Sequence, residues 1–252
     1  MQEENAIFLN QLHDLARRSY AQNVYTFTGF LNMEQLSMVL EHERELAFAG
    51  ITYFGGTQGS ERCMVRFGDP DILGYEEDFP IACLRITPLS EKFSEDLSHR
   101  DYLGALMYLG IKRSTMGDIL VFGKSARVFC TETVADFLCE SLTRVRHTPV
   151  RCERSEELPE TASVRLKRLM LIVPSLRCDV LVAKVYKLPR STGSALFRAK
   201  KVYINARQIM DGSSTVKEDD TVSVRGYGRF ICRGIRKETK KGNLQVDIDL
   251  YV

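Results

Sequence analysis

The sequence lacks the segments that export a chain or insert it into a membrane. Its opening residues, MQEENAIFLNQLHDLARRSY, carry acids where a signal peptide has lysine or arginine, and they contain no uninterrupted apolar stretch. The longest strongly apolar run, LMLIV at 169–173, is far too short to cross a bilayer. We therefore expect a cytoplasmic protein with no membrane partner.

Closely spaced cysteines are also missing. The seven cysteines stand singly, without a CxxC pair, and the four histidines are scattered. An odd number of dispersed thiols is typical of the reducing cytosol, whereas a zinc site or a disulfide framework needs ligands at short, regular spacings. We expect no metal site and no disulfide bond.

Acidic residues are scarce in one part of the chain and abundant in the other. From Ser163 onward there are 19 Lys and Arg against 8 Asp and Glu, a net charge of +11. Before Ser163 there are 16 against 25, a net charge of −9, so the formal total is +2. A basic end on an acidic body predicts docking on a polyanion by that end. The alternative, a solvated surface without a partner, usually intersperses the two signs.

The basic end is densest between residues 177 and 207. This segment, RCDVLVAKVYKLPRSTGSALFRAKKVYINAR, has eight basic side chains and one acid. Two short helical patterns lead into a strand pattern, and Lys and Arg are concentrated where these elements meet. Such an arrangement can hold a phosphate backbone, so the sequence predicts a non-catalytic RNA-binding protein.

Residues 1–79 predict two helices followed by a β-hairpin. Apolar residues recur at helical spacing near the N-terminus, and Asn32 precedes a second helical pattern, MEQLSMVLEHERELAFA. Strand patterns follow at 51–54 and 63–67, joined by GGTQGSER. This loop lacks the following helix and Lys-Ser pair of a phosphate-binding loop, so we expect a plain hairpin connection.

Residues 80–160 predict a β-α-β-β-α-β alternation. The segments are IACLRIT, SHRDYLGALMYLG, GDILVFG, SARVFC, TETVADFLCESL and TPVRCER. This order predicts a four-stranded antiparallel sheet with both helices on one face, as in RNA-binding modules of the RRM (ferredoxin-like) type. The third strand, 125–130, lacks the aromatic motif that stacks bases. We expect the open face to be a scaffold, or to touch RNA by charge alone.

A charged, proline-containing stretch at 153–163, ERSEELPETAS, marks the boundary of a third domain, 161–252. A strand leads into its basic segment, and two alternating runs around residues 241–243 predict a terminal hairpin. With the regions 1–79 and 80–160, the sequence predicts a multi-domain α+β protein, expected to be a monomer.

Each part of the basic segment has a physical role in the predicted binding. Arg177 and Asp179 open the first helical pattern, where the helix dipole favours a carboxylate and an arginine can reach outward. Pro189 fixes the entry to the second helix, whose free amides suit a phosphate. Helical spacing places Ser194, Arg198 and Lys201 on one polar side, and allows Ala195, Leu196 and Ala199 to face inward.

The candidate RNA contacts are polar or basic side chains of this segment and of the later segment VRGYGRF. They are Arg177, Lys187, Arg190, Ser191, Ser194, Arg198, Lys200, Lys201, Asn205, Arg207, Arg225, Tyr227 and Arg229. A base can stack on Tyr227, although a structural bend with a buried tyrosine is an open alternative. A second candidate contact comprises Arg100, Lys112 and Arg113, for which an ordinary solvated helix end is the alternative.

The third region resembles the RNA-binding domain named after ribosomal small-subunit protein four, here called the S-four domain. The resembling positions are Arg177, Asp179, Arg190, Ser191, 196–199, 202–205 and the strand TVSV at 221–224. That family commonly has glycine where this chain has Lys200, Ala206 and Asp219. A residue with a side chain costs roughly 1 kcal/mol in a left-handed turn, so we expect altered turns within a retained fold.

Most of the chain resembles the YlmH-type proteins of bacteria, which join an N-terminal region and an RRM-like plait to a C-terminal S-four domain. The resemblance rests on HRDYLGALMYLGIKRSTMGDILV, the basic segment and VRGYGRF. It implies a ribosome-associated factor that binds ribosomal RNA of the large subunit, with peptidyl-tRNA beside it, in rescue or quality control of stalled translation. No DNA and no cofactor are expected.

Two other functions stay open. S-four domains also accompany RNA-modifying enzymes such as pseudouridine synthases and methyltransferases. The sequence has no glycine-rich cofactor loop after a strand, no nucleotide-binding signature and no GRLD-type aspartate motif, which disfavours catalysis. The acidic N-terminal half alternatively suits an adaptor that binds basic ribosomal proteins.

Overall fold

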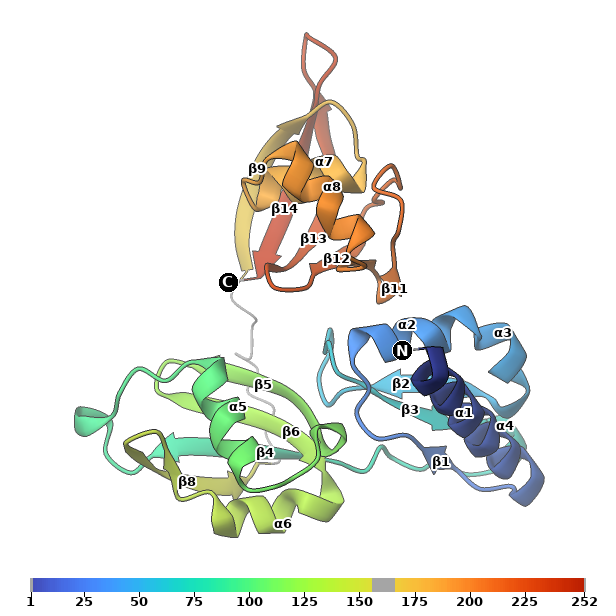
Figure 1. The fold of residues 1–252 in the computed structure, drawn as a ribbon, viewed down its shortest axis with the longest axis vertical. Coiled ribbons are helices and arrows are strands. Elements are labelled where there is room, and N and C mark those ends of the chain that lie inside the picture. The colour runs from blue at the N-terminus through green and yellow to red at the C-terminus, as the bar shows by residue number, and fades with distance from the viewer. Residues whose placement is uncertain (1, 156–165, 252) are drawn as a thin grey trace. The chain divides into compact units, whose positions relative to one another are not determined.

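The computed structural model of the protein describes residues 2–155 and 166–251 and divides into two compact units, residues 1–162 and 163–252 (Figure 1). Both units combine helices with antiparallel sheets, so the predicted α+β class is confirmed. The predicted border at 79/80 falls inside the first unit, and the border at 160/161 lies outside the described residues. None of the helices in the described ranges is long and apolar enough to span a membrane.

The first unit begins with the predicted helices and hairpin. Asn32 starts the second helix because its side chain accepts the backbone N–H of Gln35, whose side chain accepts the N–H of Asn32 in return. The sequence pattern missed the short strand that completes a three-stranded sheet of order β1-β3-β2. The elements are α1 (Gln2–Gln22), β1 (Thr26–Phe27), α2 (Met33–Glu41), α3 (Glu43–Leu46), η1 (Ala47–Ala49), β2 (Ile51–Phe54), β3 (Met64–Phe67) and α4 (Pro70–Leu73).

The plait follows in the same unit, with the predicted order of strands and helices. Its sheet has the order β5-β6-β4-β8-β7, so the prediction of four strands was wrong by one short strand, β7, which pairs with β8. The elements are β4 (Ile81–Pro88), η2 (Glu91–Phe93), α5 (His99–Tyr108), η3 (Arg113–Thr115), β5 (Met116–Phe122), β6 (Ser125–Thr131), α6 (Glu132–Ser141), β7 (Arg144–Val145) and β8 (Thr148–Arg154).

Both helices of the plait cover one face of its sheet, as predicted. Tyr102 and Leu106 of α5 and Leu138 of α6 are fully buried in one cluster with the inward side chains of the strands. The α5 helix starts at Ser98, whose backbone N–H and hydroxyl both donate to the carboxylate of Asp101. The opposite face of the sheet is therefore not covered by α5 or α6.

The N-terminal region and the plait are joined inside the first unit by a half-buried arginine, Arg62. The Arg62 guanidinium donates to the carbonyl oxygens of Met116 at 2.8 Å, Arg113 at 2.9 Å and Phe30 at 3.0 Å. Burial, and then the nearby Arg113 guanidinium, lower the pKa of Arg62 to about 10, so it stays charged at neutral pH.

The second unit is a six-stranded sheet of order β11-β10-β12-β13-β14-β9 with two helices on one face. The predicted helix-turn-helix, the strand TVSV and the terminal hairpin are all present. The elements are β9 (Leu166–Val173), α7 (Cys178–Val185), α8 (Arg190–Arg198), β10 (Val202–Ile204), β11 (Arg207–Gln208), β12 (Thr221–Val224), β13 (Gly228–Glu238) and β14 (Leu244–Tyr251).

The face of this sheet away from the helices carries an ion-pair network. Asp249, only 4% exposed, accepts hydrogen bonds from Arg168 on β9 and Arg233 on β13. These hydrogen bonds, led by that from Arg168, hold the pKa of Asp249 at about 2. Several arginines of the basic unit therefore serve the fold.

The three positions where the S-four family commonly has glycine all adopt left-handed backbone here. The φ angles are 57° at Lys200, 63° at Ala206 and 63° at Asp219. The expectation of altered turns was therefore wrong: the left-handed turns form despite the strain that a side chain brings to this region.

Replacing Ala206 by glycine is expected to raise the free energy of unfolding of the second unit by about 0.5–1 kcal/mol. Relief of left-handed strain outweighs the added entropy of the unfolded chain. Urea unfolding measures the change. The matched control is Ala195→Gly in α8, where the same substitution at an exposed helical position should destabilise by about 1 kcal/mol. Equal effects at both positions would contradict the assignment of strain.

Candidate nucleic-acid interface

The α7 and α8 helices are held on the second unit by their apolar sides. Leu181 and Val182 of α7, and Leu196 and Phe197 of α8, are buried against the sheet. Gly193 faces α7, where a Cβ atom would lie 3.6 Å from Cβ of Ala183, so the two helices pack closely. The expectation that Ala195 and Ala199 face inward was wrong, because both are exposed and Gly193 and Phe197 take the inward positions.

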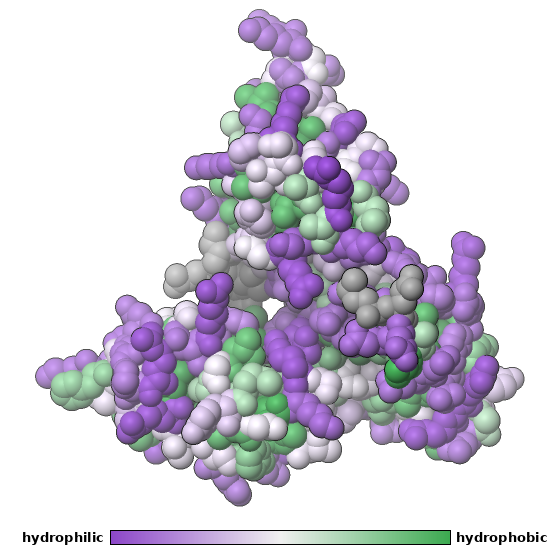
Figure 2. Space-filling view, viewed as in Figure 1, coloured by the Kyte–Doolittle hydropathy of each residue, from purple (hydrophilic) through white to green (hydrophobic). Residues whose placement is uncertain are grey.

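The charged residues on the outward side of these helices are basic from residue 180 onward. Residues 180–210 contain no aspartate or glutamate. Six exposed cations lie on or beside α7 and α8, and the described residues give none of them an acidic partner within ion-pair distance. They are Lys184, Lys187, Arg190, Arg198, Lys200 and Lys201. Hydrophilic side chains also project from this face of the second unit in Figure 2.

A groove of about 720 Å³ lies between the start of α7 and the start of α8. Lys184, Lys187 and Arg190 line it, together with Ser194. No side chain of the described residues caps the N-terminus of α8, whose N-cap is Pro189. Free backbone N–H groups beside cations form a favourable site for a phosphate.

One wall of the groove is neutralised within the protein. Arg177 donates two hydrogen bonds to the carboxylate of Asp179, at 3.0 and 2.8 Å. The hydrogen bond from Arg177 is the main cause of the lowered pKa of Asp179. The pair orients Arg177 and offsets its charge, so Arg177 has less charge available to a phosphate than the exposed cations without an acidic partner.

A second group of cations lies at the other end of α8. Arg198 ends the helix, and Lys200 and Lys201 follow it. The backbone N–H of Arg225 donates to the carbonyl of Lys201 at 2.9 Å, which brings the segment VRGYGRF beside them. At about 1.5 Å per residue, the nine residues of α8 span roughly 13 Å. Cations therefore lie at both ends of a short helix whose outward side is exposed.

The remaining predicted contacts are spread over this unit, and two of them, Asn205 and Arg229, have structural partners. Asn205 donates to Asp220 and accepts from the backbone N–H of Thr221, so its side chain fixes a turn. The Arg229 guanidinium lies 4.0 Å from the ring centre of Tyr251. Tyr227 is 43% exposed, and Arg207 and Ser191 are exposed as well. At 43% exposure Tyr227 is not buried, so the alternative of a buried tyrosine is wrong.

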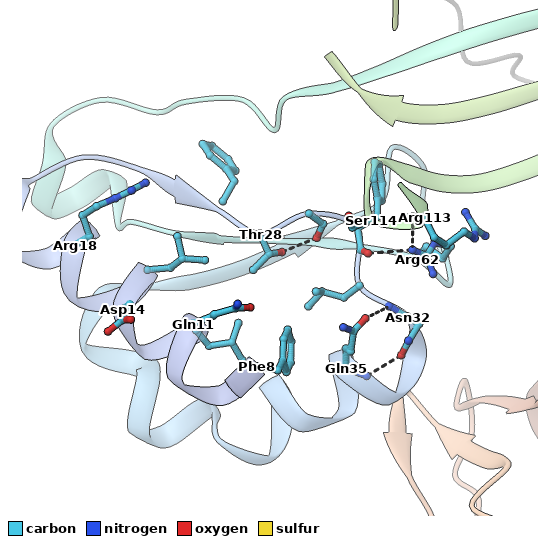
Figure 3. Close-up of a pocket in the computed structure, with 16 residues that line it drawn as sticks. Phe8, Gln11, Asp14, Arg18, Thr28, Asn32, Gln35, Arg62, Arg113 and Ser114 are labelled. Carbon is cyan, nitrogen blue, oxygen red and sulfur yellow. Dashed lines mark hydrogen bonds between the residues drawn. The ribbon is translucent and has the colours of Figure 1, made fainter. Parts of the chain in front are cut away.

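The second predicted contact, in the first unit, is divided by the structure. Arg100 and Lys112 are exposed. Arg113 is half-buried beside Arg62, at one end of a pocket whose far wall is α1 (Figure 3). It donates to the carbonyls of Met116 and Gly117, and burial lowers its pKa. Arg113 therefore supports the fold, which leaves Arg100 and Lys112 as the available cations.

The open face of the plait is partly covered. Phe129, on the strand that stacks bases in RRM-type modules, is 1% exposed. A Cβ atom on Gly56, in the hairpin loop of the N-terminal region, would lie 2.2 Å from the Phe129 ring, so this loop covers the ring. On the neighbouring strand β4, Arg85, two residues beyond the Phe129 partner Cys83, is paired with Glu153. The sheet offers no base-stacking ring at this position.

The sequence argument missed three sets of residues. Lys184 lines the groove, and its step of three from Lys187 was a usable signal. The tip of the terminal hairpin exposes Lys240 and Lys241, which a lysine pair between two strand patterns indicates. Arg62 had no signal, because its three acceptors lie far away along the chain.

Comparison with known proteins supports the resemblance. Residues 75–158 match the family model described as "Putative RNA-binding domain in YlmH". The chain is 27% identical over 251 residues to "Ribosome-associated protein quality control protein P2" of Bacillus subtilis (strain 168), covering 98% of this chain and 95% of that protein. A solved structure, "Cell division protein ylmH from Streptococcus pneumoniae", has 21% identity and a TM-score of 0.47 over 64% of this chain and 94% of its own. The resemblance predicted from the sequence is confirmed: the chain is similar over nearly its whole length to a YlmH-type, ribosome-associated protein, and residues 75–158 match the putative RNA-binding domain of YlmH.

Proposed function

We propose that the protein binds structured RNA of the large ribosomal subunit through α7 and α8, with tRNA beside it, and acts in rescue or quality control of stalled translation. It works by occupying this RNA and carries out no bond chemistry. Its place of action is then the cytoplasm, where ribosomes translate.

The observation that carries the proposal is the run of cations along α7 and α8. Lys184, Lys187 and Arg190 converge on the groove, and Lys200 and Lys201 continue the positive surface past the end of α8. No acid between residues 180 and 210 offsets them. A continuous positive surface with free helix amides can bind a phosphate backbone, whereas a small uncharged ligand would make no charge-assisted contacts with these cations.

The ribosomal assignment is supported by the Bacillus subtilis relative, whose name describes ribosome-associated protein quality control and whose similarity extends over nearly all of both chains. Ribosomal RNA supplies the folded, densely charged backbone that the α7 and α8 surface fits. Contacts that position a protein on such a backbone are mostly to phosphate and sugar, and they require cations in a fixed arrangement.

Binding of the full chain to ribosomes should weaken steeply with salt. The six cations, each engaging one phosphate, predict that the logarithm of affinity falls with the logarithm of salt concentration at a slope of about −4 to −5. Co-sedimentation with purified large subunits across a salt series measures the slope. A slope near zero would exclude a phosphate-bound mechanism, and transfer of label from S-adenosylmethionine to RNA would instead support a methyltransferase.

A further inference from the structure

The outer side of α5 in the first unit carries the most exposed aromatic ring among the described residues. Tyr108, in the last turn of the helix, is 91% exposed. Single exposed apolar residues are common on protein surfaces, so exposure by itself does not mark a site. The neighbours of Tyr108 on the same side of the helix are what distinguish it.

Gly104 lies one turn before Tyr108 on this side. Glycine weakens the interior of a helix, and it is usually retained there where another element must approach. Gly193 in α8 has that reason, since it packs against Ala183 of α7. A Cβ atom on Gly104 would meet nothing within 4 Å, so no contact within the unit requires glycine there. The result is bare backbone beside an exposed ring.

Cations flank this bare segment. Arg100 lies four residues before Gly104, and Lys112 lies four residues after Tyr108. Both are exposed, and the described part of the chain provides neither with an acidic partner. The one acid of α5, Asp101, is held by Ser98 and lies 3.6 Å from Arg146. Arg100 and Tyr108 therefore lie roughly 12 Å apart along the same side of the helix, at about 1.5 Å per residue, and Lys112 follows the end of the helix beyond the turn at Gly110.

Because the open face of the plait sheet is partly covered, the outer side of α5 is the alternative surface for base stacking. In RRM-type modules the sheet stacks the bases, but here Phe129 is buried beneath the loop that contains Gly56. The α5 helix lies on the other face of the sheet, toward the viewer in Figure 1, and its outer side is open to solvent.

We propose that the outer side of α5 is the RNA contact of the 75–158 domain and that it binds single-stranded RNA. The Tyr108 ring stacks on an unpaired base, the strand passes close to the bare backbone at Gly104, and Arg100 and Lys112 hold phosphates. A ring can stack only on a base released from a duplex, which selects single strands. This surface is separate from the α7 and α8 surface, so it extends the proposed function to a second RNA segment.

The test uses the full chain carrying Lys184→Glu and Arg190→Glu, which disables the groove on the second unit. The probe is a fluorescent single-stranded RNA about 12 nucleotides long, of mixed sequence, followed by anisotropy. Tyr108→Ala should lower affinity about 5- to 100-fold, and Tyr108→Phe should restore it, because stacking needs the ring. Gly104→Gln should lower RNA affinity, because the added side chain obstructs the approach of the strand to the backbone. It should also raise the thermal midpoint of unfolding, because glutamine favours a helix interior more than glycine does.

The control is Phe93→Ala, which removes another highly exposed ring of the same unit, 79% exposed and placed between Glu91 and Glu95. It should leave RNA affinity unchanged. The proposal is overturned if the parent does not bind the probe, or if Tyr108→Ala binds it as tightly as the parent. It is also overturned if Tyr108→Ala loses only ribosome co-sedimentation, which would assign the surface to a protein partner. None of these outcomes tests the proposed RNA contact of α7 and α8, which the salt series tests separately.

Discussion

Reversing Lys184 and Arg190 to glutamate in the full chain is expected to lower affinity for large ribosomal subunits by about 100-fold or more. Each reversal removes a charge-assisted contact, which is worth about 1.5–3 kcal/mol, and places a carboxylate next to a phosphate. The slope of affinity against salt should become shallower by about two, since two fewer phosphates are engaged. Co-sedimentation across a salt series measures both quantities.

A matched control separates this site from net charge. Lys167→Glu with Lys217→Glu changes the total charge of the same unit equally, at two exposed lysines outside the α7 and α8 surface. It should reduce affinity only slightly, through the general field of the unit. An equal loss of affinity in both double variants would mean that RNA binding depends only on the overall charge of the unit and that the groove is not a specific phosphate-binding site. Unchanged circular dichroism in both shows that the fold is intact.

Replacing Arg62 by leucine is expected to lower the free energy of unfolding of the first unit by about 3 kcal/mol or more. The guanidinium donates to the carbonyls of Phe30, Arg113 and Met116, so the substitution leaves three half-buried acceptors without their charged donor. Relief of repulsion between Arg62 and Arg113 offsets part of this loss. Urea unfolding of the full chain, followed by probes in the first unit, measures the change.

The control for Arg62 is Arg44→Leu, which removes an exposed arginine of the same unit and should change stability by less than about 0.5 kcal/mol. Arg62→Lys should fall between the two, because an ammonium cannot reach three carbonyls in a fixed fork. RNA binding by α7 and α8 should be intact in all three. Wild-type stability of Arg62→Leu would contradict its role as the link between the N-terminal region and the plait.

The order of elements was predictable because local signals mark each of them. Ser98 begins α5 and Gly110, with φ of 79°, follows its end, and both are visible in the sequence as cap and stop signals. The strand at 221–224 has the residues predicted for it. The short strands β1 and β7 were missed because two residues carry no periodicity, and only pairing with β3 and β8 makes them strands.

The candidate contacts likewise divide into features visible in the sequence and features decided by the fold. The sequence singled out Arg100 and Arg113 together, yet one is exposed and the other donates to backbone carbonyls beside Arg62. Arg177, also predicted as a contact, donates to Asp179, two residues away. Charge can be counted along a chain, but its availability depends on which acceptor the fold places within about 3 Å of it.

The sequence by itself determined that this protein is a mixed α+β chain with a basic end, because helical and strand periods and a run of residues without acids are local properties. Tertiary structure decided which cations reach solvent, that the loop with Gly56 covers Phe129, and that Tyr108 stands free beside bare backbone. These facts depend on contacts between segments that are far apart along the chain, and no local sequence pattern records such contacts. Burial at these contacts decides whether a charged side chain or an aromatic ring is accessible to RNA.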